Sequence, residues 1–112
     1  MNIEKYLPLT ETTFLILVSL TKSRHGYGII QNVEQISKGR IVLGPGTLYG
    51  ALGKLEKQNW IEKDLENSED RRKNYILTDN GILLLEAELT RLKELVEITT
   101  PIITNRGERN EK

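Results

Sequence analysis

The 112-residue chain contains no cysteine, a single histidine and few aromatic side chains: one tryptophan, four tyrosines and one phenylalanine. Without cysteine it has no disulfide framework, no thiol nucleophile and no zinc-finger spacing, and it suits a reducing cytoplasm. No apolar run approaches the length that spans a bilayer, and residues 1–5 lack the basic and apolar regions of a signal peptide. We therefore expect a soluble, cytoplasmic protein that has no membrane partner.

An excess of charge of one sign is also lacking, since 16 Lys and Arg residues balance 16 Asp and Glu residues. The charge of the whole chain therefore favours no polyanionic partner. The local balance differs, because residues 22–57 carry six basic and two acidic side chains. A chain of this length forms one small domain with a limited core, which favours association with a partner.

Signatures of catalysis are missing from the sequence. No glycine-rich phosphate loop follows a strand, no nucleophile has a base nearby, and the carboxylates are scattered over polar faces. His25 has no Asp or Cys close by in the sequence, which favours a packing or hydrogen-bonding role at a helix start over metal binding or catalysis. We predict that the protein is not an enzyme and that it holds no metal or cofactor.

The stretch 43–57 organises the rest of the chain. Leu48, Leu52 and Leu55 recur at the spacing of one helical face, so this face packs inward. Pro45 suits the first helical turn, where its missing N–H is not needed. The pattern predicts a short helix that begins near Pro45 and whose opposite face is free for a partner.

The free face of this predicted helix is made almost wholly of glycine. Gly46, Gly50 and Gly53 lie opposite the leucines, with Tyr49 on one flank. A glycine in an exposed helix interior costs about 0.8–1.0 kcal/mol relative to alanine. Two interpretations remain open: neutral drift on a solvated face, or a surface that a nucleic-acid backbone must approach closely.

The N-terminal part of the chain predicts a capped, strongly apolar helix. Thr10 has the position of an N-cap, and the run from Phe14 to Val18 is apolar without a break. Such a run also fits a buried strand, but the cap and the length to residue 20 favour a helix covered on more than one face. We expect its second face to contact another subunit.

A second helix is predicted to open at residues 25–28, with Ile29 or Ile30, Val33 and Ile36 facing the core. Gly39 has the position of the C′ residue that closes a helix. A short extended linker then leads to the helix at Pro45. Two helices joined in this way form a helix-turn-helix unit.

A β-hairpin is predicted after this unit. Asn59 tolerates the left-handed conformation that ends a helix, and residues 60–65 and 74–78 are β-prone. The polar residues 66–73 separate the two strands. A hairpin with a charged tip behind a helix-turn-helix is a wing.

The last helix begins after a turn or cap at residues 78–81. Its apolar residues repeat with 3, 4, 3, 4 spacing, which is typical of a two-stranded coiled-coil seam over about two heptads. Leu83, Leu84 and Leu95 widen this stripe beyond what one small domain can cover. Pro101 is predicted to interrupt the helix, and residues 105–112 form a polar, disordered tail. The seam residues are Ile82, Leu85, Leu89, Leu92 and Val96.

Several of these motifs together resemble the PadR-like family of bacterial transcriptional regulators. The resemblance covers residues 9–98 and keeps the family order. It implies a winged helix-turn-helix, a homodimer built through the first and last helices, repression by operator binding, and release by a small-molecule or other effector. The chain departs from the family pattern at Gly50 and Gly53, where Pro and Lys or Arg are more usual, so few contacts to bases are expected. The motifs are His25-Gly26-Tyr27, Pro45-Gly46-Thr47-Leu48-Tyr49, Ala51-Leu52, Leu55-Glu56 and Arg72-Lys73-x-Tyr75-x-Leu77-Thr78-x-x-Gly81.

The two tyrosines near the helix starts are assigned different roles. Tyr27 beside Gly26 is interpreted as a core anchor, whereas Tyr49 lies beside the leucine stripe, where a phenol can donate to a phosphate. The basic residues of the wing fit either a solvated loop or phosphate and minor-groove contacts, and their position favours contact. The predicted DNA-binding residues are Thr47, Tyr49, Gly50, Gly53, Lys54, Lys57, Arg71, Arg72 and Lys73. The predicted dimerisation residues are Phe14, Leu15, Val18, Ile82, Leu85, Leu89, Leu92 and Val96.

The sequence therefore predicts a mainly α-helical fold with a small β-hairpin. Residues 1–80 form a winged helix-turn-helix DNA-binding domain, and residues 81–104 form a dimerisation helix that packs with the N-terminal helix. The expected function is sequence-specific binding of double-stranded DNA at an inverted-repeat operator, as a homodimeric repressor released by an effector. The alternative is a winged helix that serves as a protein-interaction module without DNA binding.

Overall fold

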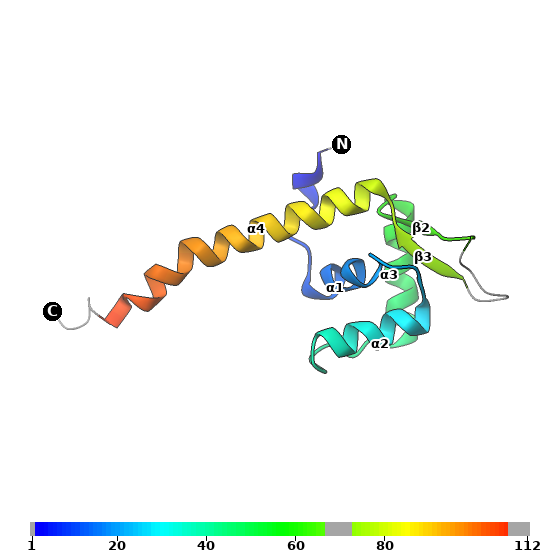
Figure 1. Cartoon of the computed structure of the whole chain (residues 1–112), viewed down its shortest axis with the longest axis horizontal. Coiled ribbons are helices and arrows are strands. Elements are labelled where there is room, and N and C mark those ends of the chain that lie inside the picture. The colour runs from blue at the N-terminus through cyan, green and yellow to red at the C-terminus, as the bar shows by residue number, and fades with distance from the viewer. Residues whose placement is uncertain (1, 67–72, 108–112) are drawn as a thin grey trace.

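A computed structural model describes residues 2–66 and 73–107 of the chain. A long helix extends away from a compact group of shorter helices and a small sheet (Figure 1), and this shape accounts for the overall extents of 67 × 33 × 20 Å. The elements are the 3₁₀ helix η1 (Ile3–Tyr6), α1 (Glu11–Ser19), β1 (Arg24–His25), α2 (Gly26–Ile36), α3 (Pro45–Lys57), β2 (Ile61–Lys63), β3 (Asn74–Leu77) and α4 (Asp79–Thr104).

The starts of three helices are fixed by side-chain caps. The Thr10 hydroxyl accepts from the Thr13 N–H at the start of α1, as the sequence predicts. His25 accepts from the Gly28 N–H through Nδ1 at the start of α2, which confirms the helix-start role of the one histidine. Thr78 caps α4 in the same way. Each cap satisfies a backbone donor that the helix itself leaves without a partner.

The ends of α2 and α3 use the same backbone motif. Asn59 adopts a left-handed conformation after α3, and the Trp60 N–H donates to the Leu55 carbonyl, as expected. After α2 the left-handed C′ position is taken by Lys38, and Gly39 lies one residue beyond it. The prediction that Gly39 is the C′ residue was therefore wrong by one position.

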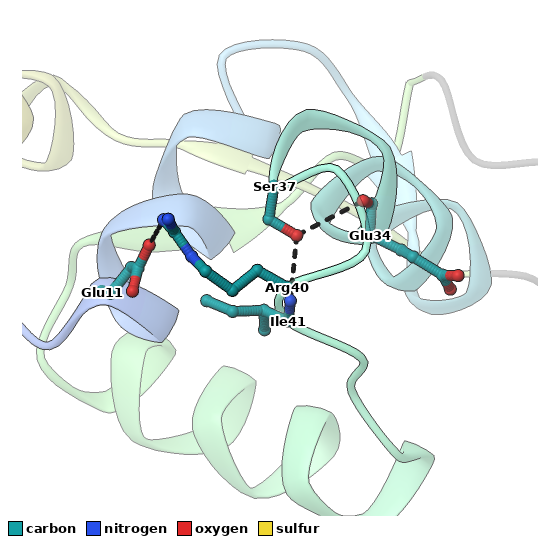
Figure 2. A network of polar contacts seen from close by, with 5 residues as sticks. All are labelled: Glu11, Glu34, Ser37, Arg40 and Ile41. Carbon is teal, nitrogen blue, oxygen red and sulfur yellow. Dashed lines mark hydrogen bonds and ion pairs between the residues drawn. The ribbon is translucent and has the colours of Figure 1, made fainter.

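The linker between α2 and α3 is held by polar contacts to α2 and to the start of α1. Ser37 Oγ donates to the Glu34 carbonyl and accepts from the Ile41 N–H, at 3.3 and 3.0 Å. Figure 2 shows Arg40 of this linker reaching across to form an ion pair with Glu11 at the start of α1. These contacts fix the path of the chain into α3.

The sheet has three antiparallel strands in the order β1-β3-β2. Strands β2 and β3 form the predicted hairpin, with Ile61 opposite Leu77. Strand β1 pairs Arg24 with Tyr75 on the other edge of β3. The sequence interpretation took residues 21–24 as a plain connection and missed this strand, which ties the start of α2 to the wing.

The core lies between α1, α2, α3 and the first turns of α4. It confirms the inward leucine stripe of α3 and the apolar run of α1, but Ile36 at the end of α2 is exposed rather than buried. Burial of these side chains supplies the main driving force for folding. The largest fully buried apolar side chains are Trp60, Ile16, Leu17, Leu20, Ile29, Leu48, Leu52, Ile61 and Leu84.

The junction between the hairpin and α4 is built on a close backbone approach. A Cβ atom on Gly81 would lie 2.0 Å from the Trp60 carbonyl oxygen, so only glycine fits there. The Thr78 N–H donates to the same carbonyl, and the Thr78 hydroxyl donates to the Asn59 carbonyl at 2.7 Å. The direction in which α4 leaves the sheet is therefore fixed by backbone packing.

Helix α4 continues through Pro101 to Thr104, so the prediction that Pro101 interrupts it was wrong. The proline lies in the last turn, where it removes a single hydrogen bond, and the Asn105 N–H donates to the Pro101 carbonyl. The side chain of Arg106 donates to the Ile103 carbonyl, so the first residues of the predicted tail, 105–107, have a defined place after α4. Residues 108–112 lie outside the described part.

A buried carboxylate joins α4 to the N-terminal segment. Glu88 is 1% exposed and accepts from the Leu9 N–H at 2.8 Å and from Arg91 Nε at 2.6 Å. The hydrogen bond from Arg91 is the main cause of its lowered pKa, and the Leu9 N–H acts in the same direction, whereas burial opposes both. The charged carboxylate thus anchors the segment that leads into α1.

Together these elements form a winged helix-turn-helix with a long C-terminal helix, which confirms the predicted fold class.

Candidate nucleic-acid interface

The outward face of α3 is open, as the sequence predicts. Ideal Cβ atoms on Gly46, Gly50 and Gly53 would have no neighbouring heavy atom within 4 Å outside the helix's own backbone. Thr47, Lys54 and Lys57 are exposed on the same helix. Few side chains protrude from this face, which has one hydroxyl and two ammonium groups at its margins. A large polar surface can therefore approach the helix backbone closely.

Tyr49 extends from α3 to the start of α2. Its side chain is 55% exposed, and a Cβ on Gly26 would lie 2.3 Å from the Tyr49 hydroxyl oxygen and 2.7 Å from the ring carbon that bears it. The missing side chain of Gly26 therefore makes room for the end of the tyrosine. This contact places the phenol where α2 and α3 meet.

Tyr27 does not belong to the core. It is 63% exposed, so its interpretation as a core anchor was wrong. Tyr27 is the second residue of α2, and its neighbours Gly26 and Ile29 are the buried residues of that turn. The sequence signal that was missed is the helical phase, because two residues before Ile29 point away from the face that packs inward.

A hollow of about 760 Å³ opens between α2, α3 and the wing. β1 brings the first turn of α2 against β3, and this pairing creates the hollow. Burial is the main cause of the raised pKa of Tyr75, and the nearby Glu56 carboxylate acts in the same direction, so this phenol stays neutral at pH 7. The lining residues are His25, Gly26, Tyr27 and Gln31 from α2 and its cap, Tyr49 from α3, and Lys73 and Tyr75 from the wing.

The tip of the wing lies outside the described residues. Arg71 and Arg72, two of the predicted DNA-binding residues, belong to that segment. Lys73 is exposed directly before β3 and borders the hollow. The structure thus brings Lys73 close to Tyr49, although 24 positions separate them in the sequence.

The predicted dimerisation residues lie on α1 and α4. Phe14, Leu15, Val18, Leu85 and Leu92 are half-buried within the chain. Ile82, Leu89 and Val96 are exposed. Leu84, which was assigned to the same stripe, is fully buried in the core of its own subunit.

The apolar stripe of α4 is longer than predicted. Because the helix passes through Pro101, the 3, 4 spacing continues from Val96 to Thr99 and Ile103. Leu95, Ile98 and Ile102 beside it are exposed as well. The seam therefore gains a further heptad that nothing within the described chain covers.

A second cavity, of about 460 Å³, lies beside this seam between α1, α2 and α4. Its apolar lining includes Phe14, Leu15 and Leu92, and its polar groups include Arg40 and Glu88. This volume is in the range of sites that hold small organic molecules.

Residues 2–66 and 73–107 contain no group of three or more side chains that could hold a metal ion. No helix in the same ranges combines the length and apolar character needed to cross a bilayer.

The fold and this surface define a winged helix-turn-helix protein. The sequence model of the family described as Transcriptional regulator PadR-like family matches residues 15–87 of the chain. The chain belongs to this family.

The chain is also similar in sequence to known proteins, one of which is a transcriptional regulator. The chain is 28% identical over 88 residues to the transcriptional regulator YqjI of Escherichia coli, a match that covers 78% of the chain and 42% of YqjI. It is 38% identical over 86 residues to an uncharacterized 37.1 kDa protein in transposon TN4556 of Streptomyces fradiae, covering 76% of the chain and 24% of that protein. The chain thus spans less than half the length of these two relatives.

Solved structures match over nearly their whole length. A PadR family transcription regulator from Clostridium difficile R20291 has a TM-score of 0.68 and 28% identity, covering 84% of this chain and 99% of that one. A PadR-like transcription factor from Bacteroides fragilis has a TM-score of 0.69 and 25% identity, covering 91% and 99%.

Proposed function

We propose that the protein is a homodimeric repressor that binds double-stranded DNA at an inverted-repeat operator in the cytoplasm and is released by a small molecule or another effector. The observation that carries the proposal is the open glycine face of α3, which lies on the surface of a winged helix-turn-helix with basic groups at its margins. The proposed role is regulatory and involves no catalysis.

The glycine face supports a close approach of α3 to the major groove. With no side chain beyond the backbone at Gly46, Gly50 and Gly53, the helix axis can lie nearer the base edges than an ordinary helix allows. Thr47 and Lys54 then hold phosphates on either side, and few side chains read bases. Much of the specificity comes from half-site spacing and from the deformability of the DNA.

Local charge supports the same partner. The segment 22–57, which contains α2 and α3, carries six basic and two acidic side chains although the whole chain is neutral. The wing residues Arg71, Arg72 and Lys73 add three positive charges, and we propose that they contact phosphates or the minor groove.

The uncovered seam of α4 supports the proposed dimer. The seam repeats for three heptads from Ile82 to Ile103, and α1 presents half-buried apolar residues beside it. A second copy of the chain supplies a matching surface because a two-fold interface pairs each patch with itself. Two winged helices held in this way match an operator with two-fold symmetry.

Release by an effector is supported by the cavity between α1, α2 and α4. A ligand bound there contacts both the helix-turn-helix and the dimerisation helix. If it prefers one relative placement of these parts, it changes the spacing of the two recognition helices and hence the affinity for the operator.

The test of the proposal is DNA binding at two salt concentrations. We expect the purified protein to select duplexes from a random-sequence pool and to bind them with an affinity that falls steeply as salt rises, because bound phosphates release counterions. The same measurement on a fixed unrelated duplex provides the reference for specificity. If no duplex is selected and binding is flat with salt, the chain is instead a protein-interaction module, a role that its zero net charge would suit.

Replacing Gly50 or Gly53 with alanine tests the close approach. Each variant is expected to be more stable by about 1 kcal/mol, since alanine favours the helix and the added methyl meets no neighbour. Each is also expected to bind the selected duplex more weakly, because the methyl holds α3 away from the groove. Thermal unfolding and DNA titration measure the two effects. Stabilised variants with unchanged affinity would favour the interpretation of drift on a solvated face.

A further inference from the structure

The hollow between α2, α3 and the wing lies beside Tyr49 of α3 and beside Lys73 and Tyr75 at the base of the wing. In the proposed complex with DNA, α3 enters the major groove and the wing reaches toward the neighbouring minor groove. A sugar-phosphate strand separates adjacent major and minor grooves of a duplex. A protein that occupies both grooves must therefore receive that strand between the two elements.

The groups that line the hollow are hydrogen-bond donors. They include the hydroxyls of Tyr27 and Tyr49, the amide of Gln31 and the ammonium group of Lys73, and no carboxylate is among them. Within the described part of the chain, neither the Tyr27 hydroxyl nor the Gln31 amide donates to another residue. The positive end of the α2 dipole faces the same space through Gly26. This chemistry suits an anion that arrives from solvent.

We propose that this hollow binds one phosphodiester strand of the bound duplex. Tyr27, Tyr49, Gln31 and Lys73 would then donate hydrogen bonds to phosphate oxygens. The proposal rests on the proposed DNA-binding function and adds Tyr27 and Gln31 of α2, which the sequence interpretation did not assign to DNA. The contacts are to the backbone, so they set the register of α3 on the duplex and carry no base preference.

Gly26 is a positioning residue of the proposed strand-binding site, because it sets the place of the Tyr49 side chain. Its missing Cβ leaves the space in which the end of Tyr49 lies, with the hydroxyl oxygen 2.3 Å from the position that a Cβ would occupy. An alanine at this position displaces the far end of a flexible side chain and leaves the backbone in place. The fold is kept while the Tyr49 hydroxyl leaves the hollow.

The first experiment removes single hydroxyls. The probe is a duplex that the wild-type protein selects from a random-sequence pool, and binding is followed by fluorescence anisotropy. Tyr27→Phe and Tyr49→Phe are each expected to weaken binding about ten- to a hundredfold, as for the loss of a hydrogen bond to a charged group. The slope of affinity against salt should not change, because a phenol carries no charge.

Two further variants provide contrast. Lys73→Ala should weaken binding and reduce the salt slope by about one unit per subunit, because it removes a cation. Tyr6→Phe is the matched control. Tyr6 packs edge-on against Trp60 with ring centroids 5.1 Å apart and does not line the hollow, so its variant should bind like the wild type.

The role of Gly26 is tested by a double-mutant cycle. Gly26→Ala should keep or raise the unfolding temperature and weaken DNA binding about as much as Tyr49→Phe. In a Tyr49→Ala background the same substitution should cause no further loss. Additive losses would show that Gly26 does not act through Tyr49.

The two levels of the proposal fail in different ways. If the wild type selects no duplex, the proposals of DNA binding and of a strand-binding site are both wrong. If Tyr27→Phe and Tyr49→Phe bind the selected duplex as tightly as the wild type does, only the proposed strand-binding site is overturned.

Discussion

Replacing both Leu89 and Val96 with aspartate is expected to convert the protein into a folded monomer that no longer binds its operator. Both side chains are exposed within the subunit, at 46% and 62%, so the charges do not disturb the core of the chain. In the proposed dimer both lie in the seam, where an unpaired carboxylate loses its water. We expect the dimer dissociation constant to rise at least about a hundredfold, measured by analytical ultracentrifugation.

Thr90→Asp is the control for this prediction. Thr90 is exposed on α4 next to Leu89 but lies outside the 3, 4 repeat, so the same charge should leave the dimer intact. Circular dichroism checks that the helices of the double variant remain. A wild-type protein that sediments as a monomer at micromolar concentration would refute the dimer.

Gly81→Ala is expected to destabilise the fold, in contrast to the alanine substitutions at Gly26, Gly50 and Gly53. The new Cβ would lie 2.0 Å from the Trp60 carbonyl oxygen and 3.0 Å from its carbon, and neither atom can move without shifting the backbone between α3 and β2. The Thr78 N–H donates to the same carbonyl, so the hairpin and α4 are disturbed together. We expect a loss of about 3 kcal/mol and a fall of at least about 10 °C in the unfolding temperature.

The matched control for Gly81→Ala is the same substitution at Gly50. Both glycines lie in helices, but a Cβ on Gly50 has no neighbour within 4 Å. The two variants should shift the unfolding temperature in opposite directions. Equal shifts would show that the contact at Trp60 relaxes without cost.

Local signals in the sequence were sufficient for most of the fold. The cap at Thr10, the leucine stripe of α3 and the left-handed Asn59 all act within one or two helical turns, and each was predicted correctly. For residues 78–81 the sequence left a turn or a cap open, and the structure shows a cap at Thr78. Strand β1 was missed because two residues carry no periodicity, and its pairing with β3 bridges 50 positions of sequence. Pro101 was misinterpreted because a proline within a helix removes one N–H donor and crowds the preceding turn without always ending the helix, and here α4 continues for only three residues beyond it.

The candidate site was predicted only in part. The open face of α3 could be derived from helical geometry alone, because it depends on the spacing of residues within one element. The hollow could not be, since it exists only where β1 brings α2 against the wing. The contact of Tyr49 with Gly26 likewise joins two helices, and nothing in either local sequence indicates it.

Helix α4 projects away from α3 (Figure 1), and these two parts of the chain differ in net charge. Helix α4 carries five acidic and two basic side chains, whereas the segment with α2 and α3 is basic. A neutral chain of this kind has little attraction for DNA at long range, but near a duplex we expect the basic segment 22–57 to turn toward the phosphates. We therefore expect short residence on random genomic DNA together with productive orientation at each encounter, a combination that favours a rapid search for the operator.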